Sequence, residues 1–383
     1  MVKGILVRLA LVVFLLFSSG LAYGSHHSKI EILGKRMFMD PNFSRNGTQS
    51  CNTCHEKRLA FVDPANVSDP ANSVVSLGDD GVSTGDRNSP TAAYAGYSPK
   101  LHWDTQKDVY VGGMFWDGRA TGWILGDPLA EQAQGPPLNP VEMNMPSKEA
   151  VVNVIRHARY ANMFLQVFGP DALDDVDKAY DYFALAIAAF ERSGWVQKFN
   201  SRFDSGDLNA QELRGYELFK ANCSECHSAD PGPDGSPPLF TDYSYHNIGL
   251  PANPLLADKG TDLGLGGFLE KDYASDAPII GDGNYEAQYG KFKVPTLRNI
   301  AVTPPYGHNG YFASLRDMVS FHNSRDTGNW PEPEVSDNLD DEVGNMGLSE
   351  QDIDDIVAFL HSLTDSRGNG HGGHGNGGHG MSR

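Results

Sequence analysis

The chain has 383 residues, and its 49 acidic and 30 basic side chains leave a formal net charge of −19 at pH 7. This acidic balance, without any cluster of basic residues, argues against nucleic-acid binding, and the length predicts about two domains. Gly and Pro are abundant, at 42 and 23 residues, while strand-like alternation is scarce, so we expect helices joined by long structured loops.

Residues 1–24 are typical of a secretory signal peptide. Basic residues open the chain, an apolar run follows from 9 to 17, and small residues lie near Ala22 and Gly24. The run is too short to cross a bilayer comfortably, although a retained membrane anchor stays open as the alternative. We therefore expect a periplasmic, secreted or cell-surface protein.

Two C-x-x-C-H motifs use all four cysteines of the chain; their residues are Cys51, Cys54 and His55 in the first, and Cys223, Cys226 and His227 in the second. A zinc ribbon places its cysteine pairs about 15–20 residues apart, far closer than here, and a thioredoxin-like dithiol lies near a βαβ pattern that this chain lacks. Neither alternative explains the histidines. The motif attaches c-type haem through two thioether bonds, with the adjacent imidazole on the iron. The sequence therefore predicts two covalently bound haem c groups.

The segments around the two motifs repeat each other. "LGKRMFMD" and "RGYELFKAN" precede the motifs and share Gly-x-x-x-Phe, while "YFALAIAAFERS" and "DIDDIVAFLHSL" close the two halves with apolar residues at helical spacing. Ser349 followed by Asp352 predicts a capping box at the start of the last helix. The pattern predicts a mainly α fold of two cytochrome c-like domains, each with one covalently bound haem c and long structured loops.

We place the N-terminal domain at 25–204 and the C-terminal domain at 205–366. The remaining residues, 367–383, form a Gly/His-rich tail that we expect to be disordered. Its histidines, His371, His374 and His379, could bind copper or nickel weakly, or the tail could serve only to keep the protein soluble.

Several blocks between and around the haem motifs resemble, in order, those of the bacterial dihaem cytochrome c peroxidase and MauG family. They include "LGKRMFMDPNFSRNG", "RNSPT", "FWDGRA", "LAEQAQGP", "PVEM" and "KFKVPTLRNIAVTPPYGHNG", and they cover nearly the whole chain after the signal peptide. The resemblance implies that His55 ligates a peroxide-reacting N-terminal haem and His227 an electron-handling C-terminal haem.

The same resemblance implies roles for residues outside the haem motifs. Trp116 corresponds to a tryptophan between the two haems, Glu142 to a distal glutamate, and Gln132 to a distal-pocket glutamine. The chemistry is consistent, because a carboxylate in an apolar pocket can move a proton during peroxide cleavage. Without the resemblance, core packing would be the simpler interpretation of Trp116, and a surface position that of Glu142.

The resemblance also implies an interdomain calcium ion and a further haem contact. The calcium would be bound by Asn88 and by the backbone carbonyls of Thr303 and Pro305, oxygen ligands of the type that calcium prefers. His308, in "PPYGHNG", corresponds to a histidine close to the C-terminal haem.

Two departures from the family pattern are informative. Many family peroxidases carry a histidine in the loop before the "RNSP" block, where it caps the N-terminal iron until the other haem is reduced. Residues 62–91 contain no histidine here, so we expect a five-coordinate or water-bound N-terminal haem that needs no reductive activation.

The second departure concerns the sixth ligand of the C-terminal haem. The family places this ligand fourteen residues after the histidine of the "PYGHNG" block, as methionine in the usual peroxidases and tyrosine in MauG. That position is His322 here, so we predict a bis-histidine haem held by His227 and His322. Met318 is the rival, because Ser314 and Asp317 predict a helix that places it one turn earlier on the same face.

These features predict a peroxidase that reduces hydrogen peroxide with electrons from a small redox protein, either a cytochrome c or a cupredoxin. One alternative is a MauG-like enzyme that oxidises a side chain, such as a tryptophan, of a partner protein. The other is a non-enzymatic dihaem electron carrier. The resemblance also makes a homodimer one expected assembly, since family members are often dimers.

Overall fold

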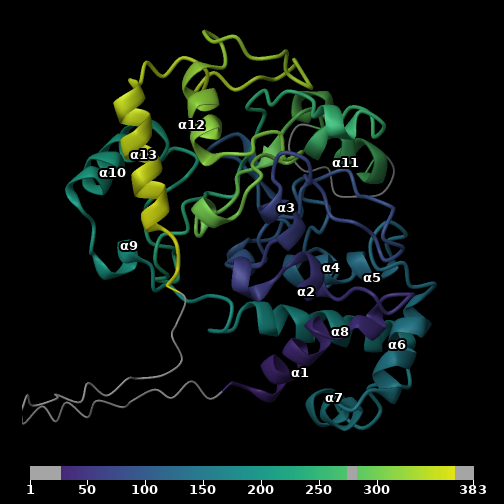
Figure 1. Ribbon diagram of the computed structural model, residues 1–383. Coiled ribbons are helices and arrows are strands. Elements are labelled where there is room, and N and C mark those ends of the chain that lie inside the picture. Colours follow the sequence, from purple (N-terminus) through teal and green to yellow (C-terminus); the bar gives the residue numbers. More distant parts are fainter. Residues whose placement is uncertain (1–26, 274–282, 367–383) are drawn as a thin grey trace, which may run out of the picture.

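The computed structural model of the chain describes residues 27–273 and 283–366. The expected signal peptide and tail lie outside these ranges. The described chain is mainly helical, as expected, and forms two halves, with the N-terminal half below and the C-terminal half above in Figure 1. None of its helices has the length and apolar character needed to cross a membrane.

The N-terminal half contains eight of the described α-helices and a two-stranded antiparallel hairpin. The helices are α1 (Lys29–Phe38), α2 (Cys51–Cys54), α3 (Pro64–Ser68), α4 (Pro128–Ala133), α5 (Gly135–Leu138), α6 (Lys148–His157), α7 (Ala161–Phe168) and α8 (Val176–Glu191), and the strands are β1 (His102–Asp104) and β2 (Val109–Val111). Short 3-10 segments cover Pro41–Phe43, Lys57–Leu59 and Ala95–Tyr97.

The C-terminal half is built in the same way from helices, long loops and one short strand pair. Its helices are α9 (Arg202–Ser205), α10 (Ala210–Asn222), α11 (Gly264–Tyr273), α12 (Leu315–Ser324) and α13 (Glu350–Ser362), its strands are β3 (Tyr245–His246) and β4 (Phe292–Lys293), and its 3-10 segments cover Pro254–Leu256, Glu286–Gln288 and Ile300–Val302.

Each half is organised around one crossed helix pair, α1 with α8 and α10 with α13 (Figure 1). Gly34 of α1 faces the carbonyl of Ala186, and Gly215 of α10 faces the carbonyl of Asp355, so closely that a Cβ on either glycine would overlap that carbonyl. The glycine of each Gly-x-x-x-Phe motif is therefore the point of closest approach in its pair. The predicted capping box at Ser349 and Asp352 is present at the start of α13.

Replacement of Gly215 by alanine is expected to destabilise the protein by about 1–3 kcal/mol, because the added methyl group would force α10 away from α13. This cost exceeds the roughly 1 kcal/mol that alanine contributes over glycine within a helix. Denaturant unfolding of the haem-loaded protein measures the change. Gly194→Ala is the matched control, because a Cβ at Gly194 meets open space; equal stability of the two variants would contradict the packing argument.

The two halves are joined by main-chain bonds and by a buried ion network. The Gly112 amide, just after β2, donates to the Tyr243 carbonyl, just before β3, at 3.0 Å. Arg87 of the N-terminal half bonds Asp262 of the C-terminal half, with Nε 2.6 Å from Oδ2, and its Nη1 lies 2.5 Å from Oδ2 of Asp117. These contacts fix the segment around residues 112–118 between the halves.

Candidate active site

The first C-x-x-C-H motif forms the short helix α2, and His55 ends it. Nδ1 of His55 lies 3.1 Å from the carbonyl oxygen of Phe61, so the ring can donate there and keep Nε2 free for a metal. Burial lowers the pKa of His55, which favours the neutral imidazole that binds iron. Burial also raises the pKa of both Cys51 and Cys54, and neither cysteine forms a disulfide.

The second motif repeats this geometry at the end of α10. Nδ1 of His227 lies 2.8 Å from the carbonyl oxygen of Phe240, and burial lowers the pKa of His227 to about 4. Cys223 and Cys226 are also free. Both motifs therefore present two unpaired thiols and one oriented, neutral imidazole, which is the donor set for haem c.

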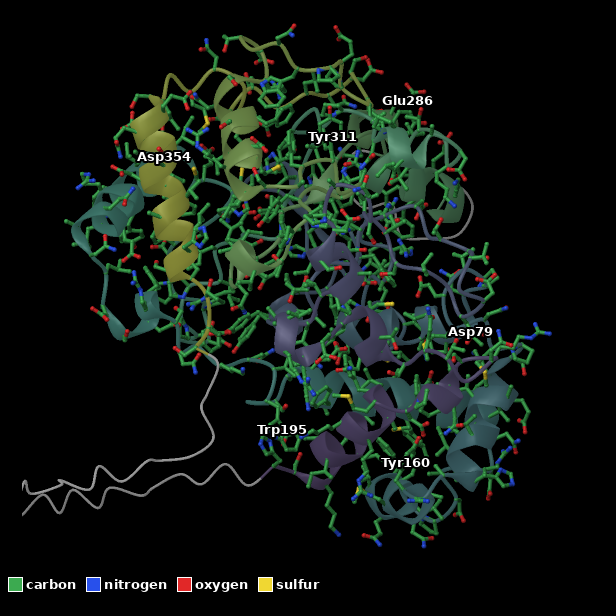
Figure 2. The ribbon with its side chains drawn as sticks, in the orientation of Figure 1. Asp79, Tyr160, Trp195, Glu286, Tyr311 and Asp354 are labelled. Carbon is green, nitrogen blue, oxygen red and sulfur yellow. The ribbon has the colours of Figure 1, made fainter. Side chains whose placement is uncertain are left out.

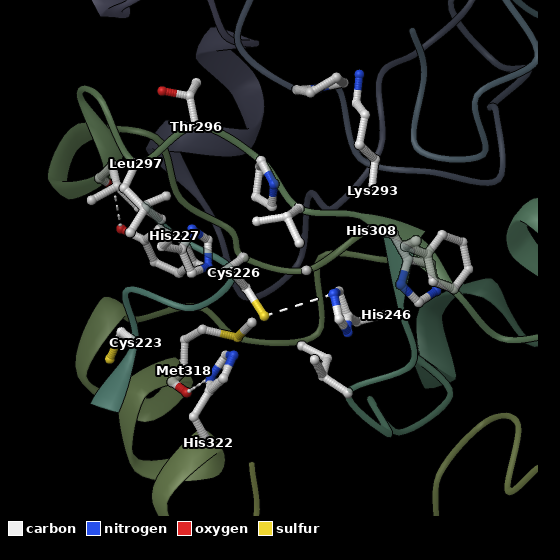
Figure 3. Close-up of a pocket in the computed structure, with 18 of the residues that line it drawn as sticks. Cys223, Cys226, His227, His246, Lys293, Thr296, Leu297, His308, Met318 and His322 are labelled. Carbon is white, nitrogen blue, oxygen red and sulfur yellow. Dashed lines mark hydrogen bonds between the residues drawn. The ribbon is translucent and has the colours of Figure 1, made fainter. Parts of the chain in front are cut away.

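A cavity of about 640 Å³ adjoins the second motif, within the range of cofactor sites. Cys223, Cys226 and His227 line it (Figure 3). The hydroxyl group of Tyr243 also lines the cavity and has no hydrogen-bond partner among the described residues. Such a buried orphan donor fits a carboxylate of the haem, so the residues present fit the predicted group.

Both candidate sixth ligands line the same cavity from α12. Ser314 caps this helix as expected, its side chain accepting from the Asp317 amide at 3.1 Å. Figure 3 shows Met318 and His322 together on one side of the cavity. Nδ1 of His322 lies 2.8 Å from the Met318 carbonyl oxygen, which leaves Nε2 free as in the two proximal histidines. Burial lowers the pKa of His322 as well. The choice between the two ligands stays a prediction.

Glu142 lines a second cavity, of about 400 Å³, which is formed mainly by the N-terminal half and also by Phe268 of α11. Its Oε1 accepts from Nδ2 of Asn139 at 2.8 Å, and burial raises its pKa while Arg119 lowers it. Its charge in turn raises the pKa of Cys51 and Cys54, so it lies within electrostatic range of the first haem motif. The carboxyl is therefore suited to take up and release a proton near that haem.

Asp79, labelled in Figure 2, anchors the histidine-free loop. The Asp79 amide donates to the Glu142 carbonyl at 2.7 Å. Its carboxylate accepts from the Asn46 amide at 2.8 Å and from the Thr48 hydroxyl at 2.7 Å. The loop is thus fixed to the segment that leads into the first haem motif, without a side chain that could ligate iron as histidine does.

Gln132 lies on α4 and is not among the described residues that line the Glu142 cavity, whereas Gln134 is. Nε2 of Gln134 donates to Asp181 at 2.8 Å. Phe115 and Arg119 also line this cavity, with the guanidinium 3.7 Å from the centre of the phenyl ring. Sequence reasoning missed these three residues, and the distal role of Gln132 stays a prediction.

Trp116 lies where the halves meet. Its Nε1 donates to the Asn88 carbonyl at 2.9 Å, and its own carbonyl accepts from the Lys293 amide of β4 at 2.9 Å. Trp116 lines the large cavity, while the adjacent Phe115 lines both cavities. The N-terminal half thus holds the indole, and the C-terminal half holds the main chain of the same residue.

The expected calcium ligands all belong to the lining of one cavity. Asn88, Thr303 and Pro305 all line the large cavity, and the Asn88 amide donates to the His308 carbonyl at 2.7 Å. The His308 ring stacks on Phe292 with ring centres 3.5 Å apart, and it lines the same cavity. Whether calcium binds stays a prediction.

Replacement of Arg119 by glutamine is expected to move the acidic limb of the pH–rate profile for the peroxide reaction to higher pH. Burial raises the pKa of Glu142 and the charge of Arg119 lowers it. Without that charge the pKa of Glu142 rises further, so the carboxyl is protonated at a higher pH. A base is inactive once protonated, so the rate falls earlier as pH decreases. Arg119→Lys, which keeps the charge, should leave the limb in place. An unchanged limb in Arg119→Gln, measured by stopped flow, would show that this charge does not act on the base.

Comparison with known proteins agrees with this geometry. The model of the di-haem cytochrome c peroxidase family matches residues 28–212, and that of cytochrome c matches residues 213–364. The methylamine utilization protein MauG of Paracoccus denitrificans is 42% identical over 88% of each chain. The cytochrome c551 peroxidase of Nitrosomonas europaea is 31% identical over 87% of this chain and 79% of the relative.

Two solved structures are similar over 88% of this chain. The diheme peroxidase BthA of Burkholderia thailandensis has a TM-score of 0.76 and 30% identity over 86% of its length. A MauG-like protein associated with microbial copper homeostasis has a TM-score of 0.63 and 29% identity over 90% of its length. The resemblance and the two cytochrome c-like folds expected from the sequence are confirmed. The chain therefore belongs to the di-haem cytochrome c peroxidase family, as a peroxide-using oxidoreductase with two haem c groups.

Proposed function

We propose that the protein is a periplasmic peroxidase that reduces hydrogen peroxide to water with electrons from a small redox protein. The observation that carries this proposal is Glu142, a carboxyl with a raised pKa that lines a cavity within electrostatic range of the first haem motif. An electron carrier with both irons closed would need no proton-moving group there.

A haem held by Cys51, Cys54 and His55 would supply an iron that reacts with peroxide. Glu142 accepts the proton from the oxygen nearer the iron and returns it to the leaving oxygen, which assists cleavage of the O–O bond. The Asn139 amide orients the carboxyl through its 2.8 Å bond, and Arg119 restrains its pKa. The histidine-free loop supports an open iron in the resting protein.

Trp116 serves as the electron relay between the two haem sites in this proposal. The bond from Nε1 to the Asn88 carbonyl restrains the indole, and the bond from the Lys293 amide restrains the Trp116 main chain. His227 and His322 would hold the C-terminal haem, which would supply electron transfer only. Asn88, Thr303 and Pro305 would bind calcium, and the Asn88 carbonyl is also the hydrogen-bond acceptor of the Trp116 indole.

A second candidate function is oxidation of a side chain in a partner protein. Two observations favour it: the 42% identity to the Paracoccus MauG, and a histidine where a methionine would raise the potential of the C-terminal haem. A low-potential haem is a poor acceptor from a high-potential donor, and it more readily shares an oxidising equivalent.

Two measurements on the purified dihaem protein separate these functions. A high-spin ferric signal in the resting EPR spectrum is expected for an open N-terminal iron, and only low-spin signals would remove both enzymatic proposals. A steady-state assay with peroxide and reduced cytochrome c or cupredoxin then decides. Rapid turnover supports the peroxidase, whereas negligible turnover with a long-lived oxidised state supports the protein oxidase.

A further inference from the structure

His246 is a partly buried histidine that the proposed chemistry does not use. It lies on β3 and lines the large cavity together with His227 and His322. Its Nε2 is 3.7 Å from Sγ of Cys226, the contact drawn as a dashed line in Figure 3. That sulfur becomes a thioether when haem c is attached, so His246 lies at the edge of the C-terminal haem.

The other ring nitrogen of His246 is bonded to a carboxylate. Nδ1 pairs with Oδ2 of Asp340, and the Asp340 amide donates to the Asn247 carbonyl at 2.8 Å, so the main chain holds the two residues together. Burial alone would lower the pKa of His246, but its contacts with Asp340 and with the free Cys226 thiol outweigh burial and raise the pKa to about 10. Once the thiol has become a thioether, the Asp340 carboxylate on Nδ1 is the group that still favours the charged ring. The ring is therefore an imidazolium, with its carboxylate on the side away from the sulfur.

The other carboxylates near the His246–Asp340 ion pair are each paired with a cation. Asp242 bonds Lys107 at 2.8 Å and accepts from the Ser244 hydroxyl, which lies 2.9 Å from Nε2 of His246. Arg325, which also acts on Asp340, pairs with Asp326 at 2.7 Å. Each of these carboxylates has its own cation, so the imidazolium is the charge that directly contacts the sulfur.

We propose that His246 is a positioning residue that raises the reduction potential of the haem attached at Cys226. A cation beside the porphyrin favours the ferrous state. Bis-histidine ligation gives a lower reduction potential than histidine–methionine ligation, and His246 offsets part of this difference. The inference rests on the proposed assignment of this haem as the electron-handling one.

The test is a potentiometric titration of the full dihaem protein, monitored by absorption. His246→Gln, which is neutral and of similar size, is expected to lower the midpoint potential of the low-spin C-terminal haem and leave the N-terminal haem unchanged. His246→Lys, which keeps a positive charge, should recover most of the loss. His157→Gln is the matched control, since His157 is an exposed histidine on α6 of the other half.

The glutamine and lysine variants together separate charge from packing. Equal potentials in wild type and His246→Gln, or an equal fall in both variants, would overturn the inference. Haem content and the visible spectrum show whether each variant is intact, and His246→Asn serves as the neutral variant if His246→Gln fails to load haem. The reduction potential tests the role of His246, and the peroxide assay tests the proposed function. A negative result in one measurement therefore leaves the other proposal in place.

Discussion

Replacement of Glu142 by glutamine is expected to slow the reaction of the resting protein with peroxide by about 10²–10⁴-fold, the usual contribution of a positioned general base. Glutamine has the same shape, and its carbonyl can still accept from Nδ2 of Asn139, as Oε1 of Glu142 does. What is lost is the ability to take up a proton. The effect should therefore fall on the chemical step rather than on folding or haem loading.

Stopped-flow mixing of the diferric protein with peroxide measures this step directly. Glu149→Gln is the control, because Glu149 is an exposed carboxylate on α6 that pairs with Arg156. The control should react like wild type, and haem content and melting temperature should be equal in all three proteins. If the Glu142 variant reacted as fast as wild type, the proton would have to move by another route, and the cavity at Glu142 would lose its assigned role.

The features that were predictable from sequence are those fixed by local or covalent chemistry. Thioether attachment dictates the spacing of Cys51, Cys54 and His55, so the motif alone indicates the cofactor. Capping at Ser349 depends on a bond to a residue three positions away. The Gly-x-x-x-Phe repeat was visible in the sequence, and the structure shows that Gly34 and Gly215 leave room for a carbonyl of the partner helix.

The features that were missed depend on backbone direction and on contacts between distant segments. Gln134 is the C-cap residue of α4 and the N-cap residue of α5. Successive side chains of a helix differ in direction by about 100°. The residue at which α4 ends therefore decides whether Gln132 or Gln134 lines the Glu142 cavity. No sequence pattern indicates that residue. Phe115 has a φ of 64°, rare for a bulky residue, and this conformation directs it toward Arg119.

The pairing of His246 with Asp340 is of the same kind. It joins residues 94 positions apart, through a loop whose path no local pattern reveals. The charge of His246 depends on the positions of Asp340 and Cys226 in the folded protein, which the sequence does not give. Electrostatic properties of a site are the hardest to predict from sequence, because they depend on burial and on every neighbouring charge.

Replacement of His322 by methionine is expected to convert the C-terminal haem from bis-histidine to histidine–methionine ligation. The wild-type ferric protein should lack the near-infrared charge-transfer band of methionine-bound haem, and the variant should show it. Its midpoint potential should rise by a sizeable part of the about 0.8 V that axial ligands span. The reason is geometric: Nδ1 of His322 is occupied by the Met318 carbonyl at 2.8 Å, which directs Nε2 into the cavity.

Met318→Leu is the matched control for this change, since Met318 lines the same cavity one turn earlier on α12. Its spectrum and potential should equal those of wild type. A methionine band in the wild-type protein that disappears in Met318→Leu would make Met318 the ligand instead. The His322→Met variant also bears on function: with a higher-potential C-terminal haem it should accept electrons faster from a cytochrome or cupredoxin. A rise in steady-state peroxidase rate would show that histidine at this position restrains turnover with such donors, as a protein-oxidising enzyme requires.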